Sequence, residues 1–306
     1  MIIAGPTASG KSALALALAQ RLQGTVINAD AMQCYRELRI ITARPSVEDE
    51  RLVPHLLYGV RAAEEPANAA WWRAAALEAM SACDLPILCG GTGMYFSALI
   101  HGIAEIPEIN PATREQARLL VAALGPAAVH AMLDARTAAK LQPGDTQRVA
   151  RAYEVFLETG KGLAFWQSQP TEQLTGWRMK MILLDPDREA LREAIAARFA
   201  AMLAAGALAE VRDFLSLGLD PALPLMRAHG VPELGAYLRG EAPLEEASAR
   251  AILATHQYTK RQLTWFRHQR LVDNSDMQII RSRMDDSAQF SESFMGDLVN
   301  FINSPG

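Results

Sequence analysis

The sequence predicts an α/β fold, in which a core built on a mostly parallel sheet carries a helical insertion domain. Three observations predict this class. Short apolar runs alternate with helix-like segments, these runs end in glycine or acidic residues, and one long stretch without a convincing strand interrupts the pattern. Strands that alternate with helices form parallel sheets, and ligands bind at the carboxyl ends of such strands. We therefore expect a ligand site at one edge of the sheet.

Four apolar runs are the expected strands. They are residues 1–4, 25–30, 85–93 and 179–185. A segment without helix breakers, residues 12–22, follows the first run and is the first expected helix. Longer helical patterns cover residues 188–217 and 244–269.

This pattern predicts three parts of the chain. Residues 1–109 and 179–274 form the core, and residues 110–178, with amphipathic Ala, Leu and Arg segments, form the helical insertion. Residues 275–306 are polar and rich in Ser and Asp, so we expect a weakly packed or disordered tail.

Composition narrows the class further. The chain has 306 residues, half of them apolar, which allows a sizeable core. No apolar run approaches the ~20 residues that span a membrane, and the N-terminus lacks a secretory pattern. The three cysteines, Cys34, Cys83 and Cys89, show no CxxC spacing and are expected to be reduced thiols. We expect a cytoplasmic protein that does not bind a membrane.

The segment GPTASGKS matches the phosphate-binding pattern G-x-x-x-x-G-K-[ST] at every fixed position. Its residues are Gly5, Pro6, Thr7, Ala8, Ser9, Gly10, Lys11 and Ser12. In such a loop, glycines turn backbone amides toward phosphate oxygens, the following helix presents its positive end, and the Ser hydroxyl holds Mg²⁺. Lys11 is expected to face solvent and aim its charge at phosphate. The motif predicts a di- or triphosphate ligand but no particular reaction.

Two acidic residues could serve this ligand, because a kinase or nucleotide hydrolase also needs an Asp after an apolar strand. Asp185 is followed by Pro186 and Asp187, which favours a strand-ending turn and a helix N-cap. Asp30 ends a strand on the same rim as the loop, which favours a functional carboxylate.

The net charge of −4 argues against nucleic-acid binding through bulk charge. Only five of the 30 basic residues are Lys, and Arg suits bidentate phosphate contacts. Basic residues cluster in two segments, which contain Arg148 and Arg151, and Lys260, Arg261, Arg267 and Arg270. A solvated helix face is the alternative interpretation of Arg148 and Arg151.

Six blocks give the sequence a specific resemblance. They are GPTASGKS, INADAMQCYRELRIITARPS, VPHLLYG, ILCGGTGMYFSAL, DTQRVARAYEVFLETG and KRQLTWFR. In this order, from about Met1 to Arg270, the chain resembles the tRNA dimethylallyltransferases, also called tRNA isopentenyltransferases. The resemblance implies transfer of a dimethylallyl group from dimethylallyl diphosphate to N6 of the adenosine at tRNA position 37, with release of diphosphate. It also implies that the insertion grips the anticodon stem-loop and that no protein partner is obligatory.

The resemblance assigns roles to individual residues. Asp30 matches the catalytic Asp, which would accept a proton from the adenine amine, and Thr92 and Arg227 match residues that contact the diphosphate. The loop from Gly5 to Ser12 would hold the diphosphate, with Mg²⁺ near Ser12. The expected tRNA-binding residues are Asp30, Ala31, Met32, Gln33, Thr92, Arg114, Gln147, Arg148, Val149, Ala150, Arg151, Lys260 and Arg261.

One block leaves two readings open. Lys260 and Arg261 contact RNA directly, or they lie along the surface while Leu263, Trp265 and Phe266 pack in the core. The chain also departs from the usual family pattern at Ala31, Ile41, Arg44 and Leu56. None of these departures removes a group assigned to the chemistry.

Two other function classes use the same loop. A small-molecule or nucleotide kinase would employ Asp30 as a base toward a hydroxyl. A non-catalytic RNA-binding module would use a phosphate ligand only for order. Turnover of ATP, or absence of product from dimethylallyl diphosphate and tRNA, would distinguish them.

Overall fold

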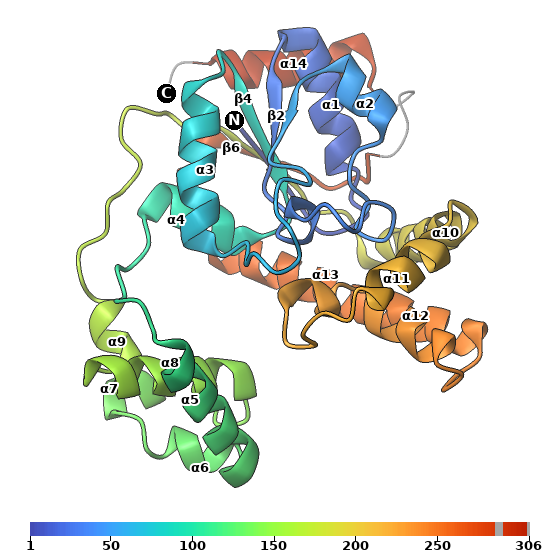
Figure 1. Cartoon of the computed structure of the whole chain (residues 1–306). Helices are drawn as coiled ribbons and strands as arrows, with labels where there is room; N and C mark the ends of the chain where they lie inside the picture. The colour runs from blue at the N-terminus through green and yellow to red at the C-terminus, as the bar shows by residue number, and fades with distance from the viewer. Residues whose placement is uncertain (285–289, 305–306) are drawn as a thin grey trace. The chain divides into compact units, whose positions relative to one another are not determined.

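The computed structural model describes residues 1–284 and 290–304 (Figure 1). Its chain divides into two compact units. The core unit contains Met1–Ile100 and Thr175–Gly306, and the helical unit contains His101–Leu174. Both boundaries of the helical unit lie somewhat N-terminal to the expected 110 and 178.

The core unit contains a six-stranded sheet in the order β3-β2-β4-β1-β5-β6. The strands are β1 Ile2–Ala4, β2 Thr25–Asn28, β3 His55–Leu56, β4 Pro86–Gly90, β5 Met181–Leu184 and β6 Met277–Ile280. Every pair is parallel, and in the centre Ile3 lies opposite Cys89 on one side and Ile182 on the other. The inner strands are buried on both faces, as expected for a parallel sheet covered by helices. The predicted α/β class is confirmed.

Helices cover both faces of this sheet. On one face, α1 Lys11–Leu22 and α14 Glu292–Asn303 share a hydrophobic cluster with the strands. On the other, α3 Ala69–Ser81 packs against β2, and its Trp72 stacks on Tyr95 of α4 Gly93–His101. The Trp72 indole nitrogen also donates to the Asn28 carbonyl, 2.7 Å away, which ties α3 to the end of β2. In the chain, η1 Met32–Cys34 and α2 Val47–Leu52 come between β2 and β3.

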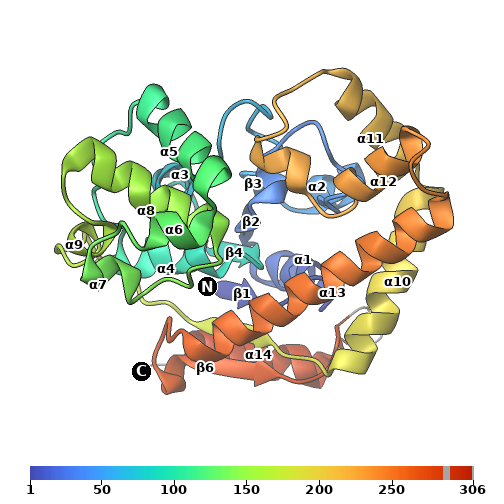
Figure 2. The same ribbon diagram turned by 90° about the horizontal axis from the view of Figure 1, so that it is seen from below.

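A group of helices forms a second hydrophobic cluster in the core unit. It comprises α10 Arg188–Ala204, α11 Ala207–Ser216, η2 Pro224–Arg227, α12 Val231–Leu238 and α13 Leu244–His268. The long helix α13 runs beside α10 and α12 (Figures 1 and 2).

The expected continuous helical pattern over residues 188–217 is two helices. Gly206 has φ +102°, a left-handed conformation suited to glycine, and the chain bends by 69° between α10 and α11. In the described part of the chain, only this bent pair has the length and composition of a membrane span, and no single helix does.

The C-terminal segment corrects the sequence prediction. After η3 Asn274–Asp276, strand β6 extends the sheet beside β5, and α14 buries Met295 and Leu298 against it. The expected weakly packed tail is therefore wrong for residues 275–284 and 290–304. Residues 285–289 and 305–306, also assigned to that tail, lie outside the described residues.

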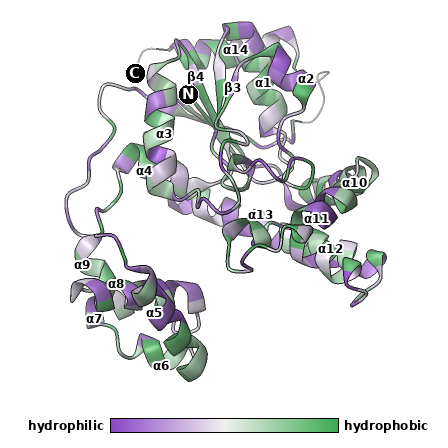
Figure 3. Ribbon diagram, in the orientation of Figure 1, coloured by the Kyte–Doolittle hydropathy of each residue, from purple (hydrophilic) through white to green (hydrophobic). Residues whose placement is uncertain are grey.

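The helical unit is built from five helices among its residues. They are α5 Pro111–Leu124, α6 Pro126–His130, α7 Ala135–Ala138, α8 Thr146–Thr159 and α9 Leu163–Trp166. Helices α5 and α8 each carry both hydrophobic and hydrophilic residues (Figure 3), and their apolar faces meet at Val121 and Val149, where Val129 of α6 joins them. This unit has its own small core.

Candidate active site

The phosphate loop joins β1 to α1, as the motif predicts. Gly10 is the N-cap of α1 with φ +90°, and no side chain caps the helix. Its first backbone amides thus remain for another acceptor, and the helix dipole makes that end positive. Ala8 also has a positive φ of 65°, so the loop keeps a conformation that non-glycine residues rarely adopt.

Lys11 is more enclosed than expected from the sequence. Only 7% of Lys11 is exposed, and its ammonium donates to the Pro6 carbonyl at 3.3 Å. Burial lowers the pKa of Lys11, and the nearby Asp30 carboxylate opposes this shift. The loop folds around the lysine, so the expected solvent-facing position is wrong, and the charge sits in a region of low dielectric where it acts strongly.

Sequence reasoning missed Arg198, a second cation of this region. It lies on α10, and burial lowers the pKa of Arg198 while Asp30 raises it. The Arg198 charge also lowers the pKa of Lys11. Burial thus lowers the pKa of both cations and the Asp30 carboxylate opposes both shifts, an arrangement suited to a polyanion. No local motif marks Arg198, because its helix lies far along the chain from the loop.

Asp30 lies just beyond the end of β2 and is held by local bonds. Its amide donates to Oδ1 of the buried Asn28 at 2.8 Å, and its own Oδ1 accepts from the Met32 amide at 3.1 Å. Thr92 lies beside it, since the Thr92 hydroxyl accepts from the Ala31 amide at 3.0 Å. The two residues predicted to act in chemistry are therefore brought together across β2 and β4.

Two residues of α13 link this pair to the phosphate loop. Gln262 accepts from the Thr7 amide at 2.9 Å and donates to the Gly91 carbonyl at 3.0 Å. The Tyr258 hydroxyl is hydrogen-bonded to Thr92 and Gln262, and burial raises the pKa of Tyr258 to about 12. Both residues were missed by the sequence analysis, although they are four positions apart on one helix face and flank the basic pair.

The same helix resolves the open reading of KRQLTWFR in part. Leu263 and Phe266 are buried in the core, and Trp265 lies against Gly93. Lys260 and Arg261 are exposed, and the Arg261 guanidinium lies 5.5 Å from the centre of the Tyr258 ring. The apolar residues of this block are structural, whereas the two cations face outward beside the site.

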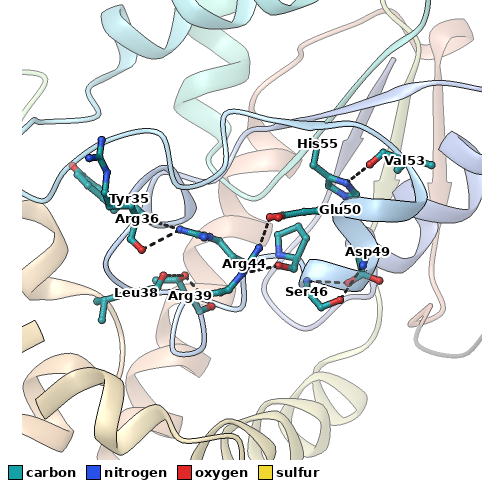
Figure 4. Close-up of polar contacts among 12 residues, drawn as sticks. Tyr35, Arg36, Leu38, Arg39, Arg44, Ser46, Asp49, Glu50, Val53 and His55 are labelled. Atoms are coloured by element: carbon teal, nitrogen blue, oxygen red, sulfur yellow. Dashed lines mark hydrogen bonds and ion pairs between the residues drawn. The ribbon is translucent and has the colours of Figure 1, made fainter. Parts of the chain in front are cut away.

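The segment that follows η1 is fixed by polar contacts (Figure 4). Arg44 donates to the carbonyls of Tyr35 and Arg36, at 2.9 and 3.3 Å, and Arg39 pairs with Glu50. Arg44 packs so closely that a Cβ on Gly59 would lie 2.2 Å from its guanidinium. The departure at Arg44 therefore serves local packing.

The other departures also have places in the fold. Ile41 is buried in the second cluster against Gly230, and Leu56 belongs to the edge strand β3. Ala31 contributes only its backbone amide to the contact with Thr92.

Three predictions for the core unit need correction or refinement. Arg227 is exposed on η2 and donates to the Ala222 carbonyl at 3.2 Å, and no contact in the described residues joins it to the loop. Gln33 is buried, and its amide nitrogen donates to the Thr42 and Ala43 carbonyls, so this nitrogen holds the chain. Met32 is half-buried beside them.

Asp185 has a different role from the predicted cap. Asp187 is the N-cap of α10, accepting from the amides of Glu189 and Ala190. Asp185 is buried and pairs with Arg267 at 2.7 Å, so that arginine of the basic cluster is already engaged within the core unit.

The helical unit holds the remaining predicted residues on α5 and α8. Arg114 and Arg151 both pair with the buried Glu154, and Arg148 pairs with Asp145. The exposed Gln147 lies beside Arg148, whereas Val149 is fully buried and Ala150 is half-buried. Because a helix turns by about 100° per residue, five successive residues cannot share one exposed face, and Val149 is the one turned to the core.

These features define an α/β protein with a phosphate-loop motif at the carboxyl ends of parallel strands and a carboxylate beside it. The sequence profile of the IPP transferase family matches residues 33–269, and that of the isopentenyl transferases matches residues 1–53. The chain belongs to the IPP transferase family, as the resemblance predicted.

Relatives and solved structures agree with this assignment. The chain is 62% identical to the tRNA dimethylallyltransferase of Acidiphilium cryptum, over 99% of this chain and 94% of the relative. It is similar to the crystal structure of a full-length tRNA isopentenylpyrophosphate transferase from Bacillus halodurans, with TM-score 0.68, 29% identity, and coverage of 98% and 95% of the two chains. It shares its fold with a eukaryotic dimethylallyltransferase acting on tRNA, with TM-score 0.80 and 24% identity over 99% of this chain and 79% of that one.

Proposed function

We propose that this protein transfers a dimethylallyl group from dimethylallyl diphosphate to N6 of the adenosine at tRNA position 37 and releases diphosphate. The observation that carries the proposal is one hydrogen-bonded network. It connects a cation-bearing phosphate loop, through Gln262 and Tyr258, to Thr92 and the segment of Asp30. In this proposal, the site for the leaving group and the proton acceptor both lie at the carboxyl ends of the parallel strands.

The proposed reaction breaks the bond between the allylic carbon and oxygen, and forms a bond between that carbon and N6. Negative charge grows on the departing diphosphate, which the loop amides, Lys11 and Arg198 stabilise by preorganised electrostatics. The adenine amine is a weak nucleophile because its lone pair is delocalised into the ring. The Asp30 carboxylate accepts its proton as the new bond forms.

The residues of the loop fit a magnesium ion that arrives with the diphosphate. Ser12 is exposed at the start of α1 and its side chain is hydrogen-bonded to the Cys89 thiol. Among the described residues no group of three or more His, Cys, Asp or Glu could hold an ion alone. Mg²⁺ is often held by few protein ligands together with phosphate oxygens. Ser12 would supply the protein ligand, and the ion would neutralise charge on the leaving group.

The tRNA would be bound through phosphate contacts and through bases of the anticodon loop, with the target adenosine turned out of its stack. Arg114, Gln147, Arg148 and Arg151 of the helical unit, with Lys260 and Arg261 of α13, supply the polar and basic side chains for this role. A tRNA substrate agrees with the cytoplasmic location expected from the sequence.

The test is to incubate unmodified tRNA with the protein, Mg²⁺ and dimethylallyl diphosphate, then digest it and analyse the nucleosides by mass spectrometry. We expect N6-dimethylallyladenosine, mapped to position 37. A Lys11→Ala protein and a reaction without the diphosphate are the controls. Consumption of ATP with phosphorylation of an acceptor, and no prenylated nucleoside, would instead support the kinase alternative.

A further inference from the structure

The segment after β6 lies directly against the phosphate loop. The Arg283 Nε donates to the Ala8 carbonyl at 3.1 Å, and the Met284 amide donates to the Ser9 carbonyl at 3.0 Å. Gly10 approaches the same segment so closely that a Cβ there would lie 1.6 Å from the Met284 carbonyl oxygen. Three successive loop residues thus contact two residues from the far end of the chain.

These bonds control where the loop amides point. A peptide unit is planar and trans, so its carbonyl and its N–H point in opposite directions. When Arg283 and Met284 hold the carbonyls of Ala8 and Ser9 on one side, the amides of Ser9 and Gly10 must face the other side. There the Ser9 amide donates to the Pro6 carbonyl at 3.3 Å, which closes the turn of the loop, and the Gly10 amide is the one aimed toward the ligand side. The contacts also stabilise the left-handed conformation of Ala8, which is unfavourable for a residue with a Cβ.

The supporting residues are themselves firmly placed. Met284 is buried in the cluster that joins the sheet to α1 and α14. The preceding strand β6 is paired along its length with β5, and the Asp185 amide donates to the Ile280 carbonyl at 2.8 Å. The sheet therefore carries this segment to the loop as a fixed support.

We propose that Arg283 and Met284 form a brace that positions the loop amides for the diphosphate. The family profile ends at residue 269, so this role lies outside the matched region. The inference rests on the proposed function, because it assumes that the loop holds the diphosphate. Arg283 is a positioning residue here, acting through the Ala8 carbonyl.

A matched pair of variants tests the brace. Arg283→Met removes the bond to Ala8, while Arg281→Met makes the same change two residues earlier, where the exposed side chain lies 3.9 Å from Asp185. Binding of inorganic diphosphate is measured by calorimetry, and KM and kcat are measured for both substrates. We expect Arg283→Met to raise the diphosphate dissociation constant and the KM for dimethylallyl diphosphate by about 5- to 20-fold.

For Arg283→Met, kcat and the KM for tRNA should remain within about twofold of the parent. Arg281→Met should match the parent in all these quantities. Arg283→Lys, which keeps a donor that reaches a carbonyl, should recover most of the affinity. If Arg283→Met unfolds at a lower temperature, the affinities are measured well below that temperature and Arg283→Met is compared with Arg283→Lys. A loss in the Met variant that the Lys variant restores supports the brace, and equal diphosphate affinity in the two overturns it.

Unchanged diphosphate affinity in Arg283→Met would overturn the brace, and so would an equal loss in Arg281→Met. These results are distinct from a failure of the proposed function. If the parent protein binds no diphosphate while remaining folded, the loop is not the diphosphate site at all.

Discussion

The phosphate loop and helix α8 both carry basic residues that the sequence singled out, but they hold their charges in different ways. Lys11 is nearly buried, and its charge is coupled to Asp30 and Arg198, which are distant in the sequence. On α8, the Arg148 side chain is 71% exposed and pairs with Asp145, three residues away.

This difference in exposure predicts that the two groups of charges respond differently to substitution and to salt. Charges in a low-dielectric site interact strongly and are little screened by salt. Interactions between exposed charges are screened beyond a Debye length of about 10 Å at 0.1 M salt. We therefore expect changes around the loop to affect chemistry or diphosphate affinity strongly. Changes on α8 should alter tRNA affinity modestly and in a salt-dependent manner.

The largest effect is expected for Asp30→Asn. The substitution keeps the side-chain size but removes the proton acceptor, so the transfer rate should fall by about 10²–10⁴-fold. At about 1.4 kcal/mol per tenfold, this is on the order of 3–5 kcal/mol of barrier. Single-turnover transfer and filter binding measure the rate and the affinity separately.

Both substrates should still bind Asp30→Asn within about tenfold of the parent affinity. Asp187→Asn is the matched control, since it makes the same change at the cap of α10, where Asn also caps well. Parental transfer by Asp30→Asn would remove this carboxylate from the chemistry.

The next effect concerns the cation of the loop. Lys11→Ala should weaken diphosphate binding by about 10- to 100-fold, because hydrogen bonds to charged groups contribute about 1.5–3 kcal/mol. The fold should persist, because α1 begins at this position and Lys11 belongs to no hydrophobic cluster of the core unit. Calorimetry with inorganic diphosphate and the far-ultraviolet spectrum check the two statements.

The pH dependence of this binding has a defined sign. Burial lowers the pKa of Lys11 in the free protein, so its positive charge is lost at a lower pH than that of an ordinary lysine. Diphosphate affinity should therefore fall with rising pH before an ordinary lysine would titrate. An alkaline decline that persists unchanged in Lys11→Arg would show that another group is responsible.

A smaller effect is expected on α8. Arg148→Ala should weaken tRNA binding by a few fold. It should also reduce the slope of log Kd against log salt concentration by about 1, because one counterion fewer is released on binding. Arg136→Ala, at an exposed site of α7 in the same unit, is the control. Equal losses in both variants would mean that the helical unit binds through overall charge and not through this face.

The smallest effect is a difference in thiol labelling behind the loop. Burial raises the pKa of Cys34 to about 12 and that of Cys89 to about 11, so both thiols remain protonated near neutral pH. Iodoacetamide at pH 8 should modify the half-buried Cys83 first, with all three reacting in the unfolded protein. Rapid labelling of Cys89 would show that the wall behind Lys11 opens to solvent.

Local patterns were sufficient to predict the loop and the strand that ends near Asp30, because the residues that define them are neighbours in sequence. Gln262 and Arg283 could not be predicted in this way. They meet the loop across separations of 255 and 275 residues, which only the assembled sheet and α13 create.

The C-terminal segment contains an apolar pattern that predicts a helix, although its overall composition is polar. Phe294, Met295, Leu298, Phe301 and Ile302 recur at helical spacing, and all lie in or against the sheet's hydrophobic cluster. By contrast, the four residues of β6 are too few to stand out among polar neighbours. Val149 belongs to the same block of sequence as Arg148 and Arg151, but the helical period turns its side chain into the core of the helical unit.

The most direct test of the central claim is to follow the bond that breaks. Dimethylallyl diphosphate carrying ¹⁸O in the bridge between carbon and phosphorus is incubated with the protein and tRNA, and the products are analysed by mass spectrometry. If the phosphate loop holds a leaving group, all of the label should appear in the released diphosphate, in an amount equal to the prenylated adenosine. Label in dimethylallyl alcohol, or phosphate on the tRNA, would mean that a phosphorus–oxygen bond is cleaved and would contradict the claim.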